Sequence, residues 1–285
     1  MKPLNIPIVA LGPGSQPMEE APDLLEVPRD FSGFVTPTVP ETADRGRFAT
    51  ARDVVRQLVQ ALSEYEAGSR SYPRLELTPL DGETTEILNQ MLLDGEVSAL
   101  ASGPGGTVKI QETNFAGVWR LLHYGPGGEL VHDHLEACPV PEAILQYADE
   151  SSAQELEVPP PPQGVMNSPT VLFEIREQAA AYAPGSPAHV VNLTLLPMSP
   201  QDYEYLNQAI PAGAVAVLSR GYGKCRVNST GLRHVWRVQY FNNMNTLILN
   251  TVEVVDIPEV VKAAWEDIDD SLGRLRELLD WMEQE

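Results

Sequence analysis

An internal duplication constrains the fold of this 285-residue chain more than any other feature. Residues 75–92 align with residues 193–210 at an offset of 118 and share seven identities. One residue is then lost and the offset becomes 117, which places Val118-Trp119-Arg120 on Val235-Trp236-Arg237. Because the matches keep their order at a nearly constant offset, we expect two copies of one unit of about 100 residues.

Each copy shows the same succession of hydrophobic patterns. A helix over 51–65 is followed by a short strand at 75–80 and a second helix, which Ser199-Pro200 opens in the second copy. β-type runs separated by glycine-rich turns come next, and in the first copy they are 97–101, 108–113, 116–124 and 130–137. A final helix is expected from Pro141 and from Pro258. Tandem hairpins favour an α+β fold, with two copies of an antiparallel-sheet unit and the helices packed on one face.

The duplication also divides the chain into segments. We expect a proline-rich N-terminal arm (1–48), a first repeat unit (49–148), a proline-rich linker (149–166), a second repeat unit (167–268) and a C-terminal helical extension (269–285).

The overall charge excludes a general nucleic-acid binder. The chain has 40 Asp and Glu against 19 Lys and Arg, a formal net charge of −21, whereas binding to nucleic acid depends on basic side chains.

Two cysteines, Cys138 and Cys225, are too few for a disulfide framework and form no CxxC motif. No signal peptide or long apolar run is present, so we expect a cytoplasmic protein without membrane insertion.

One stretch of the second copy departs from this acidity. Residues 205–252 contain no Asp or Glu but five basic side chains. The stretch is either a solvated strand surface or a docking surface for an acidic partner. Under the second interpretation, the candidate partner-binding residues are Tyr222, Lys224, Arg226, Arg233, His234 and Arg237.

A second candidate site lies in the first copy. His132, His134, Glu136 and Cys138 alternate along a predicted strand, so their side chains share one face. Same-face neighbours on a strand are about 6.6 Å apart, so one metal ion could take about two of them and would need ligands from elsewhere. The residues therefore form either part of a metal site or a half-exposed polar strand face.

The common catalytic motifs GxSxG, HExxH and GxxxxGK[ST] are absent from the sequence. We therefore expect no enzymatic activity and no cofactor. A small-molecule enzyme with its site in a cleft between the copies remains as a third class of function.

Several short motifs resemble one protein family. They are Leu11-Gly12-Pro13-Gly14-Ser15-Gln16-Pro17, Asn192-Leu193-Thr194, Leu196-Pro197-Met198-Ser199, Gly221-Tyr222-Gly223, Thr230-Gly231-Leu232-Arg233-His234-Val235-Trp236 and Ile257-Pro258-Glu259-Val260-Val261. Together they resemble the HupH/HyaF/HoxQ hydrogenase expression and formation proteins. The resemblance implies a bacterial accessory factor for maturation of an uptake nickel–iron hydrogenase, without catalytic residues of its own.

The resemblance further implies a client. It is the hydrogenase small-subunit precursor, which carries iron–sulfur clusters and an export signal, and other hydrogenase accessory proteins are additional expected partners. In the first hypothesis, a surface with Tyr222, Arg233 and His234 binds that client before export and assembly. In the alternative hypothesis, the protein carries a metal or an iron–sulfur cluster on the strand face of His132, His134, Glu136 and Cys138.

Overall fold

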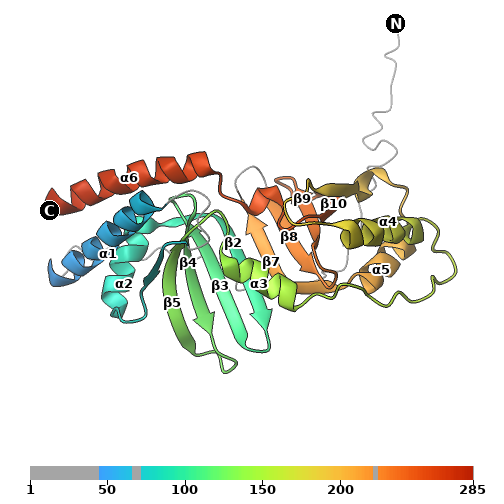
Figure 1. The fold of residues 1–285 in the computed structure, drawn as a ribbon, viewed down its shortest axis with the longest axis horizontal. Coiled ribbons are helices and arrows are strands. Elements are labelled where there is room, and N and C mark those ends of the chain that lie inside the picture. The colour runs from blue at the N-terminus through green and yellow to red at the C-terminus, as the bar shows by residue number, and fades with distance from the viewer. Residues whose placement is uncertain (1–44, 66–71, 221–223, 285) are drawn as a thin grey trace, which may run out of the picture.

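Ten strands form one continuous antiparallel sheet with helices packed against it in the computed structural model (Figure 1). The structure describes residues 45–65, 72–220 and 224–284. Of the predicted N-terminal arm, only residues 45–48 are described, and they begin a helix.

The strands are β1 (Arg74–Glu76), β2 (Asp94–Gly103), β3 (Gly106–Thr113), β4 (Val118–Tyr124), β5 (Leu130–Ala137), β6 (His189–Asn192), β7 (Ala212–Ser219), β8 (Lys224–Thr230), β9 (Val235–Phe241) and β10 (Leu247–Val254). The α-helices are α1 (Arg45–Glu64), α2 (Gly82–Leu92), α3 (Glu142–Glu150), α4 (Ser168–Ala181), α5 (Pro200–Ala209) and α6 (Trp265–Gln284). Two short 3-10 helices are η1 (Leu193–Leu195) and η2 (Glu259–Val261).

The order of strands in the sheet has a mirrored pattern. It runs β1-β5-β4-β3-β2-β7-β8-β9-β10-β6, so each half has its short first strand at an outer edge and its long second strand at the centre. The halves join where β2 pairs with β7, with Ala99 opposite Val217. The α+β class and the antiparallel sheet are therefore confirmed, and the two halves share one sheet.

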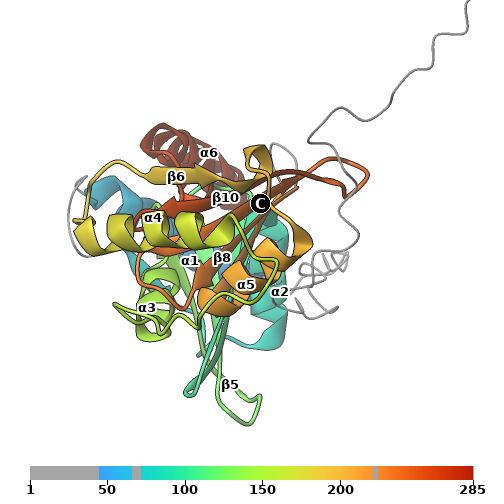
Figure 2. The same ribbon diagram turned by 90° about the vertical axis from the view of Figure 1, so that its right-hand side faces the viewer.

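The helices do not all lie on one face, and that part of the prediction is wrong. On β4, Val118 packs with α1, α2 and α6, whereas its neighbour Trp119 packs on the opposite face with Ile144 of α3. Successive strand residues point to opposite faces, so α3 and the turn η2 cover the side of the sheet that the other α-helices leave open. The core of that side contains residues of both halves. Figure 2 shows α4 and α5 over the strands of the second half.

The end of the chain also differs from the sequence pattern. A helix does begin after Pro141, but after Pro258 only the single turn η2 forms. The last helix, α6, starts at Trp265 and crosses to the first half, where Ile268, Leu275 and Met282 are buried against α1 (Figure 1). The apolar stripe of α6 is thereby covered by the body of the protein.

The helix start at Ser199 behaves as its sequence predicts. The Ser199 hydroxyl accepts a hydrogen bond from the Asp202 amide, and the Asp202 carboxylate accepts one from the Ser199 amide, which completes a capping box. Among the described helices, none combines the length and hydropathy that a membrane span requires.

Candidate functional site

The described partner-binding candidates lie in three places, which are the start of β8, the turn between β8 and β9, and β9 itself. Lys224 and Arg226 lie at the start of β8, whereas Arg233 and His234 lie in the turn between β8 and β9. The strand between these groups is roughly 20 Å long at about 3.3 Å per residue. Tyr222 lies outside the described residues. The acid-free stretch thus does not form one continuous basic patch.

Lys224 and Arg226 are exposed on one face of β8, while Cys225 between them is buried on the other. The Lys224 ammonium donates to Oδ1 of Asn245 at 2.6 Å. The Arg226 guanidinium lies 5.2 Å from the centre of the Phe241 ring, a cation–π distance. Both basic groups are therefore presented at the surface by the alternation of the strand.

Arg233 and His234 contact acidic residues from outside the acid-free stretch. Arg233 Nε lies 2.7 Å from Oδ1 of Asp149, and His234 Nδ1 lies 3.4 Å from Oδ1 of Asp256. His234 has a φ of 60°, a left-handed conformation that few non-glycine residues adopt. These contacts attach the β8–β9 turn to neighbouring segments, and the Asp149 carboxylate offsets the charge of Arg233.

Arg237 is partly buried where β9 meets α5, so it is less accessible to a partner than the exposed Lys224 and Arg226. Its Nε donates to Oδ1 of Asn250 at 2.7 Å, and Nη1 reaches Oδ1 of Asn207 on α5 at 3.5 Å. Burial lowers the pKa of Arg237 to about 10. A cavity of about 30 Å³ lies beside it, lined also by polar residues such as Gln239. The side chain therefore has a structural role at the contact between helix and sheet.

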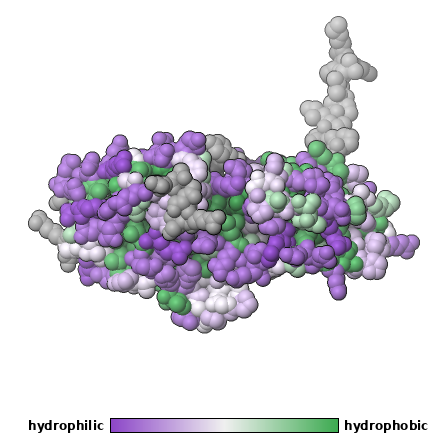
Figure 3. Space-filling view, in the orientation of Figure 1, coloured by the Kyte–Doolittle hydropathy of each residue, from purple (hydrophilic) through white to green (hydrophobic). Residues whose placement is uncertain are grey.

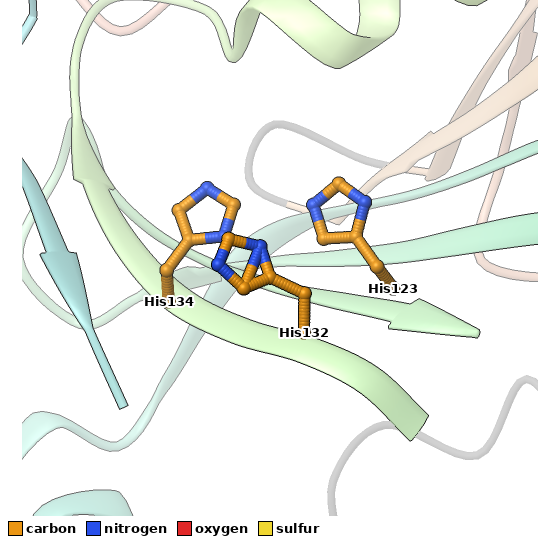
Figure 4. A group of neighbouring side chains, drawn as sticks. All are labelled: His123, His132 and His134. Atoms are coloured by element: carbon orange, nitrogen blue, oxygen red, sulfur yellow. The ribbon is translucent and has the colours of Figure 1, made fainter. Parts of the chain in front are cut away.

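Three of the four predicted metal residues, His132, His134 and Glu136, share one face of β5, and the structure adds a ligand that the sequence pattern missed. His123 on β4 lies directly opposite His132, and His134 follows two positions along β5. One ring nitrogen from each of the three histidines lies within 4.8 Å of the others. The ring centres are 4.9 to 5.4 Å apart. Figure 4 shows the three imidazoles gathered on the same side of the two strands.

The three imidazoles, which we call the histidine cluster, extend from the interior to the surface. His134 is 2% exposed, and both of its ring nitrogens lack a hydrogen-bond partner in the described part of the chain. His123 is partly buried with its Nε2 unpartnered, and 38% of the His132 side chain is exposed. Burial lowers the pKa of His123 to about 4, and the two neighbouring imidazoles add to this effect.

Two carboxylates border the histidine cluster. Glu76 on the edge strand β1 contacts Nε2 of His132, and Glu136 Oε2 lies 3.9 Å from Nε2 of His134. Burial alone would raise the pKa of Glu136, but His134 and Arg74 outweigh it and lower that pKa. The site therefore combines three imidazoles with nearby negative charge.

The cysteines take no part in this cluster. Cys138 is buried beyond the end of β5 and is not among the described ligand atoms that lie close together. Burial raises the pKa of Cys138 well above its ordinary value and that of Cys225 to about 11. Five strand spacings, roughly 24 Å at about 4.8 Å each, separate β5 from β8. The two thiols therefore cannot ligate one metal centre within a single chain.

Comparison with known proteins identifies relatives along almost the whole chain. A family model described as "HupH hydrogenase expression protein, C-terminal conserved region" matches residues 48–157 and, separately, residues 165–282. The hydrogenase expression/formation protein HoxQ of Cupriavidus necator is 44% identical over 283 residues, which are 99% of each chain. The hydrogenase-1 operon protein HyaF of Escherichia coli is 31% identical over 274 residues, 95% of each chain. A solved structure of the hydrogenase expression protein HupH from Thiobacillus denitrificans aligns with 39% of this chain and 92% of its own, at 26% identity and a TM-score of 0.37.

Proposed function

The chain belongs to the HupH family of hydrogenase expression and formation proteins, and we propose that it acts by binding the iron–sulfur small-subunit precursor of a nickel–iron hydrogenase. The family assignment confirms the resemblance carried by the short sequence motifs. It makes the protein an accessory factor of hydrogenase formation. The client, the binding mode, a non-catalytic role and action in the cytoplasm before export and assembly belong to the proposal.

The observation that carries this proposal is the extent of the similarity. The HoxQ relative matches 99% of the chain, so its two halves and their connection are retained together. The family model also matches the chain twice, once in each half. We infer that the halves are tandem copies of one unit, as the duplication predicts. In such a protein, a difference between the copies is the place to seek a specific role.

We place the client contact at the exposed basic end of β8. Lys224 and Arg226 are exposed on one face of β8 within the acid-free stretch, whereas Arg233 and His234 lie beside Asp149 and Asp256 in the β8–β9 turn. The face of the molecule drawn in Figure 3 is largely hydrophilic, with scattered hydrophobic residues. An acidic segment of the client would be attracted to this end of β8, and the negative charge elsewhere would attract the basic start of an export signal.

The first copy provides a matched control. Lys109 occupies the position 117 residues before Arg226, and its ammonium lies 5.2 Å from the Tyr124 ring centre, as Arg226 does from Phe241. The charge reversal Lys109→Glu therefore changes the net charge by the same amount as Arg226→Glu, and in the same kind of surroundings.

The test is a pull-down of the purified small-subunit precursor by the full chain. We expect Arg226→Glu to weaken capture and its matched control Lys109→Glu to leave it unchanged. The double variant Lys224→Glu/Arg226→Glu should weaken capture at least tenfold, and Arg233→Glu/His234→Ala should have a smaller effect. If the wild type does not capture the precursor, the proposal that the precursor is the client is wrong. If wild type and Lys224→Glu/Arg226→Glu capture it equally, the proposal that the basic end of β8 binds the client is wrong.

A further inference from the structure

We propose that His123, His132 and His134 form a binding site for one divalent transition-metal ion, with Glu76 at its solvent-exposed side. The proposal is independent of the client-binding function. It concerns the face of β4 and β5 that lies opposite α1, α2 and α6.

The backbone places the three imidazoles in a triangle. Directly opposite residues on antiparallel strands have Cβ atoms about 5 Å apart, which relates His123 to His132. His134 lies about 6.6 Å further along the same face of β5. Nitrogen ligands of a tetrahedral ion at about 2.0 Å are themselves about 3.3 Å apart. Because the nitrogens already lie within 4.8 Å of one another, side-chain rotation alone can close the site.

Unpartnered polar atoms point to a missing ligand. A buried ring nitrogen without a hydrogen bond is unfavourable, and three such nitrogens, two of His134 and one of His123, lie in this one cluster. A metal ion bonded to one nitrogen of each ring would give His123 and His134 each a partner for a buried nitrogen. The exposed His132 and Glu76 leave an entry path from solvent.

The donor set indicates the class of ion. Imidazole suits zinc, nickel, cobalt, copper and ferrous iron, and a carboxylate beside it is compatible with the same ions. Glu76 and Glu136 each lie next to a cluster histidine, the arrangement that orients imidazole ligands at metal centres. Iron–sulfur clusters require thiolates, and Cys138 is outside the cluster. The site thus favours a single ion over the iron–sulfur cargo in the sequence-based alternative.

The second half of the sheet has the same backbone without the ligands. Tyr240 and Leu249 lie opposite each other on β9 and β10, as His123 and His132 do on β4 and β5, and Thr251 stands at the position of His134. Both pairings contain a register shift at this point. The shared geometry does not require histidine, so the three histidines are a specific feature of the first half.

The experiment titrates the full-length chain, purified without a polyhistidine tag and stripped of metal, with Zn²⁺ in a calorimeter and with Co²⁺ in an absorption spectrometer. The chain has five histidines, and His189 and His234, which lie outside the cluster, supply the control. We expect one ion per chain and visible Co²⁺ bands of tetrahedral or five-coordinate geometry. His123→Gln or His132→Gln should weaken binding at least 100-fold, and Glu76→Gln should weaken it about 10- to 100-fold.

The control variant His189→Gln/His234→Gln should bind as the wild type does. His132 is partly exposed, so its substitution tests the site even where His123→Gln alters folding, which circular dichroism monitors. Absence of stoichiometric binding in the wild type overturns the proposal. Binding that survives in a folded His132→Gln variant, or that disappears in the control variant, also overturns it.

Discussion

Arg237 donates a hydrogen bond to the neutral side chain of Asn250, whereas Arg120, 117 residues earlier, pairs with the carboxylate of Asp133. Arg120 Nη2 and Asp133 Oδ2 are 2.7 Å apart, and both side chains are buried. Asn250 is also buried, and its Nδ2 lacks a hydrogen-bond partner in the described structure. The two halves therefore share the same contact between helix and sheet. The arginine faces a carboxylate in the first half and a neutral amide in the second.

The contrast predicts opposite effects of two reciprocal substitutions. Asp133→Asn should lower the free energy of unfolding by about 2–3 kcal/mol, since it leaves a buried guanidinium without its carboxylate. Asn250→Asp should raise it by about 1 kcal/mol, because it supplies a carboxylate and removes an unpartnered amide group. Urea denaturation measures both changes. Equal effects of the same sign would falsify the assigned role of the arginine partner.

Asp202 joins the starts of two helices and should make stability dependent on acid pH. Its carboxylate accepts hydrogen bonds from amides at the start of α4 (Met166, Asn167 and Ser168) and from Ser199 before α5. Burial alone would raise the pKa of Asp202, but these donors outweigh burial and hold the pKa well below its ordinary range. The stabilisation is therefore present above the unfolded-state pKa of about 4 and is lost as the pH falls towards the folded-state pKa.

Asp202→Asn should accordingly cost about 3 kcal/mol at pH 7, because an amide group cannot accept all these hydrogen bonds. The difference in unfolding free energy between wild type and variant should stay constant from pH 7 to about pH 5 and then shrink as the pH falls from about 5 to 3. Glu204→Gln, an exposed change on the same helix, is the control and should leave the profile unchanged. A difference that is constant across this pH range contradicts the role of the Asp202 charge.

The duplication made the order of elements predictable, but it did not determine how the halves meet. The capping signal at Ser199 and the glycine-rich hairpin turns depend on local residues, and the structure has helix α5 and the β2–β3 and β4–β5 hairpins there. The pairing of β2 with β7 and the position of α3 depend on contacts between distant segments. Hydrophobic periodicity shows that a strand is buried, but it does not show what covers each face.

The candidate metal site shows how one irregular residue limits prediction. Tyr124 pairs with Leu130, so a regular hairpin would place His123 opposite Val131. A β-bulge at this point shifts the pairing by one residue and places His123 opposite His132. Alternation along β5 correctly grouped His132, His134 and Glu136 on one face. The third imidazole could not be found, because a bulge inverts the face assignment between strands.

The buried carboxylate of Glu112 should make stability depend on pH with a sign opposite to that expected for Asp202. Burial raises its pKa to about 7, although the Gly117 amide donates to its Oε1. Because the folded state binds a proton that the unfolded state releases near pH 4.5, stability should fall as the pH rises from about 4.5 to above 7. Glu112→Gln should raise the unfolding free energy at pH 8 by roughly 2–3 kcal/mol and change it little at pH 4.5. Thermal denaturation of both proteins at the two pH values measures this, and a variant that is less stable at pH 8 contradicts it.

Gly117 controls the docking of the C-terminal helix on the first half. Its φ is 76°, and a Cβ atom there would lie 2.5 Å from Cγ1 of Ile268 on α6. Gly117→Ala should therefore lower the unfolding free energy by about 2 kcal/mol or more, because it combines backbone strain with a clash. It should also displace α6, which fluorescence of Trp265 and Trp281 on that helix reports. Gly105→Ala is the control, since a Cβ at Gly105 meets no atom within 4 Å, and it should change neither stability nor fluorescence appreciably. If the clash with Ile268 outweighs the backbone strain, Ile268→Ala should reduce the loss of unfolding free energy that Gly117→Ala causes, which a double-mutant cycle measures. Strictly additive effects of the two substitutions would show that α6 does not press on this glycine.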